Sequence, residues 1–483
     1  MTRLLPVSYN SAKKEEFRHM LHLNDTIVAI ATPQGEGGIG VIRISGAKAF
    51  DIADRLFISK GKPLRERASH TLHYGRIISP RSKEVLDDAV VSLFRSPHSY
   101  TKEDVVEFSC HGGPVTLSLV LNLCIEEGAR MAEPGEFTMR AFLNGGMDLA
   151  QAEAVCDQIR ARTVASQRAA IRQRQGELSK RMEELRSELV GVLAAIEVTL
   201  DFSEDVGDLD YPETERRIKG LIRETEQLIN MGRSGRLLRE GVRIAIAGRP
   251  NVGKSSLMNA LLRQNRSIVT PLPGTTRDVI EETINLKGVP ALIMDTAGLR
   301  ETQDIVESIG VDRARDTIKN AELVILLADA VTGWSEEEDR ILSSISGVTV
   351  LPVLNKTDMV SKEERERGLK RLREATSQSL SLAISALNGD GVEELEDTIY
   401  RMITGGDIAL SESAFITNSR HIQALKFATD ALRRGLETTR RRLPPDFISI
   451  DLRAALDEVG KITGETVTED IIHRIFQDFC VGK

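Results

Sequence analysis

A glycine-containing loop carries the strongest chemical pattern in this chain. The segment Gly248-Arg-Pro-Asn-Val-Gly-Lys254-Ser255 follows the apolar run 242–247 and precedes a helical run over 256–262. Glycines let such a loop turn successive N–H groups toward phosphate oxygens, and the following helix N-terminus adds positive potential. The lysine supplies charge for terminal phosphates and the serine a hydroxyl for Mg²⁺. The pattern predicts a nucleotide-phosphate site rather than a plain strand-to-helix turn. Its residues would be Asn251, Val252, Gly253, Lys254, Ser255 and Ser256.

A second motif indicates which base is bound. Asn355-Lys356-Thr357-Asp358 follows the apolar run 349–354, about a hundred residues after the first loop. An aspartate there accepts two hydrogen bonds, from N1–H and the exocyclic amine of guanine, and adenine lacks that pair of donors. A site built on such bonds discriminates strongly, because a wrong base leaves buried polar groups unpaired. Ser385 and Ala386 follow another short strand and would support the base, so GTP and GDP are the expected ligands.

Two further segments lie between these motifs. Asp295 ends an apolar run and would hold Mg²⁺ through water, and the N–H of Gly298 would meet the γ-phosphate. Thr276 is expected to complete the Mg²⁺ shell, so this part should differ between GTP and GDP states. The remaining expected nucleotide contacts are Thr270, Pro271, Leu272, Pro273, Gly274, Thr275, Thr296 and Ala297.

The residue after this aspartate segment sets a constraint on mechanism. Ras-type GTPases carry a glutamine there to orient the attacking water, whereas this chain has Leu299. Another group must position the water, and Glu301, Asp304 and Glu307 are the nearby carboxylates, each with an ordinary solvated charge as the alternative. No arginine is diagnostic of a finger, so a monovalent cation held by Asn251 and by oxygens of residues 270–275 could neutralise the γ-phosphate.

Composition limits the class of protein. The 483 residues exceed one core, so two to four domains are expected, and the 41% hydrophobic and 28% charged content is that of a globular protein. The net charge of −8 means that nucleic acid would need a local basic surface. No apolar run reaches transmembrane length, and no signal peptide is evident. The four cysteines are widely spaced without a C-x-x-C pair, which favours reduced thiols in the cytoplasm.

The chain divides by pattern into five parts. The expected fold is multidomain α/β plus α: an N-terminal α+β domain, a discontinuous helical bundle and an inserted Ras-like P-loop GTPase domain. Two helical blocks that flank an inserted domain are expected to pack together, because neither could bury its apolar stripe alone. The expected parts are an extension at 1–24, the α+β domain at 25–144, the first helical part at 145–238, the GTPase domain at 239–405 and the second helical part at 406–483.

The whole pattern resembles one family of GTPases. The chain ends Phe479-Cys480-Val481-Gly482-Lys483, which is similar to the F-C-I-G-K ending of the MnmE (TrmE) family of tRNA-modification GTPases. The resemblance leaves out only the first 24 residues. The other matching segments begin at Asp25, Gly37, Glu103, His111, Pro134, Arg140, Asp148, Leu237 and Gly274.

The resemblance implies an activity, partners and an N-terminal ligand. Members of the family work as homodimers with a flavin-bearing (FAD) MnmG-type partner, in a heterotetramer. Together they place an aminomethyl or carboxymethylaminomethyl group on C5 of the wobble uridine of certain tRNAs. The N-terminal domain would dimerise and hold a 5-formyl- or 5,10-methylene-tetrahydrofolate. Arg43, Glu107 and Lys483 map to folate-contacting positions, and a further family position that is often lysine falls on Gly146.

The resemblance also implies roles at the GTPase site. K⁺ would be bound by Asn251, Thr270, Leu272 and Thr275, would replace an arginine finger and would be enclosed when two GTPase domains meet. Glu307 maps to a carboxylate that acts through water, beside Lys254 and Thr276 as catalytic residues. Cys480 is a candidate for the modification chemistry, with a structural role as the alternative.

Two other functions fit parts of the sequence. A ribosome-assembly GTPase shares the nucleotide motifs, but it would carry an RNA-binding KH-type module after the GTPase domain, and none is evident. A nucleotide-switched scaffold at a membrane would need a lipidation signal or an amphipathic membrane helix, and neither is evident. Both leave the N-terminal motifs unexplained.

Overall fold

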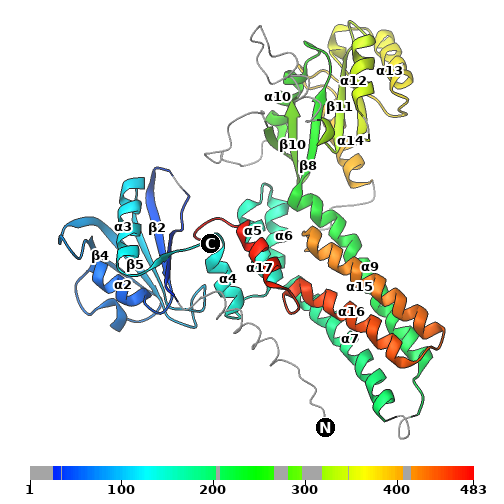
Figure 1. The fold of residues 1–483 in the computed structure, drawn as a ribbon. Helices are drawn as coiled ribbons and strands as arrows, with labels where there is room; N and C mark the ends of the chain where they lie inside the picture. The colour runs from blue at the N-terminus through cyan, green and yellow to red at the C-terminus, as the bar shows by residue number, and fades with distance from the viewer. Residues whose placement is uncertain are drawn as a thin grey trace. The chain divides into compact units, whose positions relative to one another are not determined.

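The computed structural model of the chain describes residues 25–33, 35–202, 207–265, 281–295, 318–345, 347–405 and 415–483. Within this part the chain forms two compact units (Figure 1). The first contains the described residues up to 156 together with 178–217 and 431–483, and the second contains 157–177 and the described residues of 218–430. Each unit is therefore assembled from segments far apart in the sequence. The expected extension at 1–24 lies outside the described residues.

A seven-stranded sheet forms the centre of the N-terminal part of the first unit, in the order β3-β4-β5-β6-β2-β1-β7. Neighbouring strands are antiparallel except for the parallel pair β1 and β7. The apolar runs near 26–31, 40–45, 90–94 and 105–109 form β1, β2, β5 and β6. The strands are β1 (Ile27–Ile30), β2 (Gly37–Ser45), β3 (Phe57–Ile58), β4 (Thr71–Ile78), β5 (Val85–Phe94), β6 (Val105–Gly112) and β7 (Arg130–Met131).

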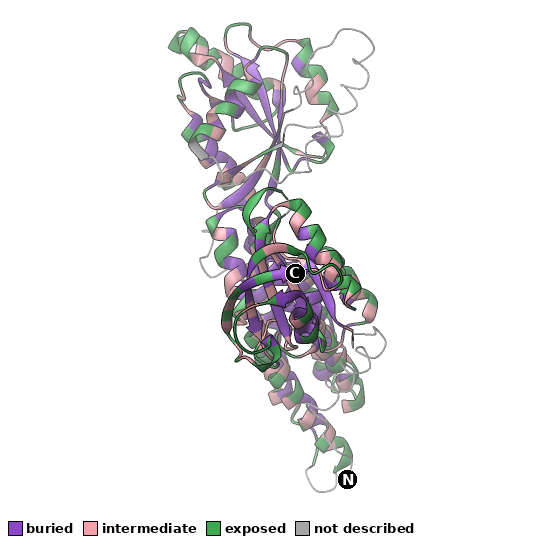
Figure 2. Cartoon of the chain, turned by 90° about the vertical axis from the view of Figure 1, so that its left-hand side faces the viewer, coloured by how far each residue is buried: buried purple, intermediate pink, exposed green. Residues whose placement is uncertain are grey.

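Helices α2 (Ala49–Leu56) and α3 (Pro114–Glu126) pack against this sheet and share its core, which includes Ile42, Val91 and Phe108. The strand interiors are correspondingly buried (Figure 2). A single-turn helix, η1 (Leu64–Glu66), precedes β4. This part also has the helix α4 (Glu136–Leu143), all of whose residues are buried.

Helix α4 contains a fully buried arginine. Arg140 is 1% exposed, and its guanidinium lies 2.6 Å from a carboxylate oxygen of Asp25, 2.9 Å from Glu136 and 3.3 Å from Glu103. It also donates to the Asp25 carbonyl at 2.9 Å. A buried charge is stable only when it is paired and hydrogen-bonded, so this cluster fixes α4 to the start of β1 and to the loop before β6.

We expect Arg140→Met to destabilise the protein by about 3–5 kcal/mol, because the change leaves buried carboxylates without their cation. Chemical denaturation of both proteins, followed by circular dichroism, measures the difference. Arg181→Met is the matched control, because Arg181 forms a solvent-exposed pair with Glu184 and should change stability by under about 1 kcal/mol. Equal stabilities of the Arg140→Met and wild-type proteins would contradict the assignment.

The same cluster ties stability to pH. Burial by itself raises the pKa of Glu136, but hydrogen bonds from Arg130, the Glu133 backbone and Arg140 outweigh it, and the pKa lies below its ordinary value. Burial also raises the pKa of Asp25, but hydrogen bonds from Arg130 and Arg140 outweigh it, so this pKa too lies below its ordinary value. A folded-state pKa below the unfolded one contributes stability above the unfolded pKa, so this contribution is lost as the pH falls below about 4.

The first unit also contains helices from both ends of the chain. Helices α7 (Glu177–Asp201) and α16 (Pro445–Thr463) lie side by side (Figure 1). Arg186 on α7 forms an ion pair at 2.8 Å with Glu465, which lies just after α16. Helix α17 (Glu469–Gln477) packs against α4 and α5 (Leu149–Arg160) in a core that includes Phe142, Leu149 and Phe476. Helical segments from either side of the GTPase region thus pack together, as expected.

The first helical part contains a break. Residues 167–200 have few helix breakers and helical apolar spacing, but the structure has two helices there, α6 (Val164–Arg174) and α7. The break falls at Gln175 and Gly176, where Gly176 adopts φ +88°. A left-handed glycine ends a helix at low cost, and the apolar spacing on both sides hid this stop signal.

The second unit is built on a six-stranded sheet in the order β13-β12-β11-β8-β10-β9, parallel except for β9 against β10. Its strands are nearly continuous apolar runs, as strands covered on both faces require. The strands are β8 (Val242–Ala247), β9 (Glu281–Leu286), β10 (Val289–Asp295), β11 (Leu323–Asp329), β12 (Thr349–Asn355) and β13 (Leu382–Ala383).

Helices lie beside this sheet (Figure 1). The long helix α9 (Tyr211–Glu240) precedes the sheet strands in the sequence, and the long helix α15 (Ser419–Arg440) follows them. Thr429 on α15 donates to Thr225 on α9 at 2.9 Å. The sheet helices are α10 (Lys254–Asn265), α12 (Glu336–Ser344), the single-turn η2 (Thr357–Met359), α13 (Lys362–Thr376) and α14 (Val392–Thr404). Among the described residues, no helix is both long and apolar enough to cross a membrane.

Candidate functional site

The phosphate-type loop connects β8 to α10 as the sequence predicted. Lys254 is buried, and its ammonium donates to the carbonyls of Gly248 at 2.8 Å and Arg249 at 2.7 Å. Asn251 and Gly253 both have positive φ, +64° and +99°. Asparagine and glycine tolerate this conformation, which bends the loop around the lysine. Ser255 and Ser256 are exposed in the first turn of α10, next to its free N–H groups.

One asparagine connects the two predicted motifs. Asn355, at the end of β12, is 2% exposed. Its side-chain amide donates to the carbonyl of Val252 at 2.8 Å, and its oxygen accepts from the N–H of Ala386 at 3.0 Å. The structure therefore brings the phosphate loop, the Asn-Lys-Thr-Asp motif and the Ser385-Ala386 loop together at the carboxyl ends of the parallel strands, where open α/β sheets bind ligands.

An ion pair holds the loop that contains the Asn-Lys-Thr-Asp motif, which we name the base loop. Lys356 has φ +62°, and its ammonium lies 2.7 Å from a carboxylate oxygen of Asp329, at the end of β11. Burial alone would raise the pKa of Asp329, but the bonds from Lys356 and the Val331 N–H outweigh it, so the pKa lies below its ordinary value. Asp358 lies exposed in η2, where its carboxylate can meet a base, and Thr357 donates its N–H to the Ile384 carbonyl at 3.2 Å.

Part of the predicted site lies outside the described residues. Asp295 ends β10, which pairs with β8 beside the phosphate loop, but its side chain is not described. Within the described ranges, no cluster of three or more His, Cys, Asp or Glu residues is arranged for a metal ion. The predicted residues outside the description are Thr270, Pro271, Leu272, Pro273, Gly274, Thr275, Thr276, Thr296, Ala297, Gly298 and Glu307.

A second predicted site lies on the seven-stranded sheet. Arg43 on β2 and Glu107 on β6 are register partners, and their side chains form an ion pair at 2.7 Å. The Arg43 guanidinium also lies 5.5 Å from the ring centre of Tyr100 and 5.6 Å from that of Phe137, and donates to the Gly482 carbonyl at 3.3 Å. The C-terminal Gly482 therefore contacts Arg43, one of the residues that the resemblance assigned to folate.

The remaining predicted residues lie in the same unit. Lys483 donates its backbone N–H to the Cys480 carbonyl at 3.3 Å, so the last residues form a turn beside Arg43. Gly146 donates its N–H to the Ala141 carbonyl at 2.8 Å, which leaves that N–H unable to bind a ligand. A Cβ at Gly146 would lie 3.2 Å from side-chain carbons of Lys102, so a lysine amine is already nearby at this position.

Reactivity toward thiol reagents should separate Cys480 from the other cysteines. Cys480 is exposed, whereas Cys110, Cys124 and Cys156 are buried. Burial, with a contribution from Asp87, raises the pKa of Cys110 to about 12, and burial also raises that of Cys124. We expect a chromogenic disulfide reagent to label one thiol rapidly in the native protein, and none rapidly in Cys480→Ser. Fast labelling that persists in Cys480→Ser would contradict the structure.

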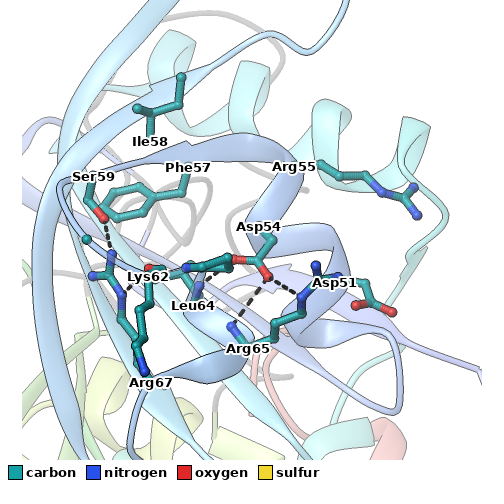
Figure 3. Close-up of a pocket in the computed structure, with 12 residues that line it drawn as sticks. Asp51, Asp54, Arg55, Phe57, Ile58, Ser59, Lys62, Leu64, Arg65 and Arg67 are labelled. Atoms are coloured by element: carbon teal, nitrogen blue, oxygen red, sulfur yellow. Dashed lines mark hydrogen bonds and ion pairs between the residues drawn. The ribbon is translucent and has the colours of Figure 1, made fainter.

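A pocket of about 530 Å³ lies beside α2 and η1, in the first unit (Figure 3). Two of its charged side chains, Asp54 and Arg67, are engaged by residues of the pocket itself. Asp54 accepts from the backbone N–H groups of Leu64 and Arg65, and Arg67 donates to Ser59 at 2.7 Å and to the Lys62 carbonyl at 2.6 Å. These bonds hold the loop closed, so the pocket is not the candidate active site.

Some residues of both sites were not predicted. Asp329 could have been suspected because it ends β11, the strand between β8 and the strand β12 that Asn355 ends. Phe137 lies in the family-matching segment that begins at Pro134, but its contact with Arg43 depends on the folding of α4 against the sheet. Arg249 and Glu338, which form a buried ion pair, carry no sequence signal beyond the position of Arg249 in the loop.

The fold and site define a P-loop GTPase domain: a parallel sheet, a loop with a buried lysine, and an Asn-Lys-x-Asp motif tied to that loop. Two family models match the chain, "GTP-binding protein TrmE N-terminus" over residues 26–146 and "MnmE helical domain" over 149–480. The chain therefore belongs to the MnmE (TrmE) family, as the resemblance implied. The family is shown over nearly the full length of the chain.

Individual relatives agree with this assignment. A protein of Thermoanaerobacter pseudethanolicus named tRNA modification GTPase MnmE is 45% identical, over 95% of this chain and 99% of its own length. A protein of Moorella thermoacetica with the same name is 47% identical, over 95% of this chain and all of that protein (100%). Among solved structures, the G domain of the T. maritima FeoB iron transporter is 29% identical, covers 33% of this chain and 97% of that chain, and has a TM-score of 0.25.

Proposed function

We propose that this chain is a GTP-hydrolysing tRNA-modification enzyme. With a flavin-bearing MnmG-type partner, it adds a carboxymethylaminomethyl or aminomethyl group to C5 of the wobble uridine of certain tRNAs. It acts in the cytoplasm as a homodimer within a heterotetramer, and its five parts are those drawn from the sequence. The observation that carries the proposal is the Asn355 bridge, because it joins the phosphate and base loops of a GTPase in a member of this family.

The described residues suit a nucleotide bound with Mg²⁺. The Lys254 ammonium rests on loop carbonyls, which are weaker partners than phosphate oxygens, and Ser255 is exposed at the helix N-terminus. Ser255, Thr276 and, through water, Asp295 would hold Mg²⁺, which neutralises charge on the β- and γ-phosphates. Asp358 would accept from guanine, and Lys356, ordered by Asp329, would lie along the base. Glu307 would position the attacking water.

Potassium is proposed as the second cation at this site. Asn251 is the one proposed ligand within the described residues, and it lies exposed in the phosphate loop. Thr270, Leu272 and Thr275 would complete the set. A cation there neutralises charge that an arginine finger neutralises elsewhere.

GTP hydrolysis should depend on the alkali ion. We expect replacement of K⁺ by Na⁺ at equal ionic strength to lower kcat by at least about tenfold, because Na⁺ is too small for a site of neutral oxygens spaced for K⁺. Phosphate release measured in both salts, with GDP affinity as the control, tests this. Equal rates in the two salts would remove potassium from the account.

The N-terminal site would hold the one-carbon donor. Arg43 lies near the Tyr100 and Phe137 rings and pairs with Glu107. This arrangement offers a carboxylate acceptor and flat apolar surfaces to a ring system with N–H donors. Lys483 would close the site, and Cys480 remains a candidate for the modification chemistry. A tetrahydrofolate derivative would supply the carbon that becomes the methylene of the modification.

Reconstitution tests the proposed function. The purified chain is mixed with an MnmG-type partner, unmodified tRNA, GTP, K⁺, Mg²⁺, a tetrahydrofolate one-carbon donor, glycine or ammonium as the source of the amine, and a reductant for the partner's flavin. The nucleosides are then analysed by mass. We expect a wobble uridine with the added mass, and none with Lys254→Ala. Unmodified uridine in the complete mixture, with GTP hydrolysis intact, would show that the GTPase serves another reaction.

A further inference from the structure

The side chain of Arg249, the second residue of the phosphate loop, bonds to residues 332–338. Its Nε donates to a carboxylate oxygen of Glu338, and its Nη2 donates to the Thr332 hydroxyl at 2.9 Å and to the Gly333 carbonyl at 3.0 Å. Glu338 is fully buried, at 0% exposure. The planar guanidinium fork is thus fixed at three points, none of which lies on the loop itself.

Glu338 has a second task at the start of α12. Its other carboxylate oxygen accepts from the backbone N–H of Ser335 at 2.9 Å and from the Ser335 hydroxyl at 2.6 Å, which completes a capping box. One carboxylate therefore joins the N-terminus of a rigid helix to the phosphate loop. The carboxylate cannot move to follow a displaced Arg249 without breaking the helix cap.

The same segment reaches the base loop at its other end. Asp329 pairs with Lys356 at 2.7 Å, and its carbonyl accepts from the Gly333 N–H at 2.8 Å. Residues 329–338, which we name the brace, thus contact the phosphate loop through Arg249 and the base loop through Lys356. The Arg249 carbonyl, whose position the side chain fixes, is also one of the two acceptors of the Lys254 ammonium.

We propose that Arg249 and Glu338 are positioning residues for guanine-nucleotide binding, which act by locking the phosphate loop to the brace. This inference rests on the proposed function, since it assigns the origin of nucleotide affinity at that site. This lock, by which we mean the contacts of Arg249 and Glu338, holds the phosphate loop in its nucleotide-binding conformation before the nucleotide binds. Less conformational entropy of the loop is therefore lost on binding. It supports ground state and transition state equally, so its loss raises KM and leaves kcat nearly unchanged.

Four variants of the full-length protein test the lock. Arg249→Met removes the fork, Glu338→Gln keeps a capping side chain but removes the charge, and the third variant combines both changes. Arg340→Ala is the matched control, because Arg340 lies on the same helix in an exposed pair with Glu336. Fluorescent GDP affinity, kcat and KM for GTP, and melting temperature are measured for each.

We expect each single change to weaken GDP binding and raise KM for GTP by about tenfold, and the double variant to match the weaker single variant, since both remove one interaction. Arg340→Ala should bind like the wild type. Partial unfolding would lower apparent kcat without changing KM, so the two effects are separable. If Arg249→Met does not fold, Arg249→Lys, which keeps the charge but loses the fork, should give an intermediate KM.

Three results are decisive. Wild-type GDP affinity and KM in Arg249→Met or Arg249→Lys would overturn the lock, as would multiplicative losses in the double variant. Wild-type protein that binds no guanine nucleotide would instead overturn the proposed function.

Discussion

Asp358→Asn should change the preferred nucleotide from guanine to xanthine. The Asp358 carboxylate offers two acceptors to the N1–H and amine of guanine, whereas asparagine offers one acceptor and one donor. Xanthine has a carbonyl where guanine has the amine, so the asparagine donor meets an acceptor. We expect GDP affinity to fall at least about hundredfold and XDP to become the better ligand, because mismatched polar groups at the base stay unpaired.

Competition between GDP and XDP for a fluorescent nucleotide measures this exchange. The main chain around Asp358 is held by Lys356 and Thr357, so the substitution changes the side chain's chemistry without moving the loop. Asp446→Asn is the control, since Asp446 is exposed at the start of α16 in the other unit and should leave both affinities unchanged. Retained GDP preference in Asp358→Asn would place the base elsewhere.

Gly253→Ala should abolish nucleotide binding at working concentrations. Gly253 has φ +99°, which alanine adopts only under strain, and an added Cβ would lie 2.3 Å from the side-chain nitrogen of Asn355. That nitrogen is fixed by its bond to the Val252 carbonyl. Strain and overlap together cost about 2–5 kcal/mol, so we expect GDP affinity to fall at least about thirtyfold.

The control for this change is another glycine-to-alanine substitution. Gly220 lies within α9, and a Cβ there would meet nothing within 4 Å. Gly220→Ala should stabilise the helix by up to about 1 kcal/mol and leave GDP affinity unchanged. Titration calorimetry with GDP compares the two variants, and wild-type affinity in Gly253→Ala would contradict the tight contact between the phosphate and base loops.

Local sequence patterns were sufficient to predict those strands, helices and loops whose conformation depends on neighbouring residues. Apolar runs of strand length that end in glycine or polar residues placed β8, β10 and β12, and the helical spacing after Lys254 placed α10. Both nucleotide motifs were predicted because each is a short contiguous pattern that directly follows an apolar strand. The sheet then brings them together without further information, since parallel strands present their carboxyl ends at one edge.

Contacts between distant segments could not be read in this way. Asn355 was expected to meet the base, but its bonds to Val252 and Ala386 depend on the pairing order of three strands. The buried pair of Arg249 and Glu338 joins residues 89 positions apart, and either residue alone looks like a surface charge. The contact between Arg43 and Gly482 spans 439 positions, and only the resemblance to a known family anticipated it.

The most direct measurement of the central claim is nucleoside mass analysis of total tRNA from cells that lack this gene. The cells are complemented with the wild-type gene, Asp358→Asn or Asp446→Asn. The account predicts that the C5 modification of the wobble uridine is lost on deletion, returns with the wild type and Asp446→Asn, and stays absent with Asp358→Asn. A modification that persists in the deleted cells, or that returns equally with Asp358→Asn, would contradict a guanine-nucleotide-driven tRNA-modification enzyme.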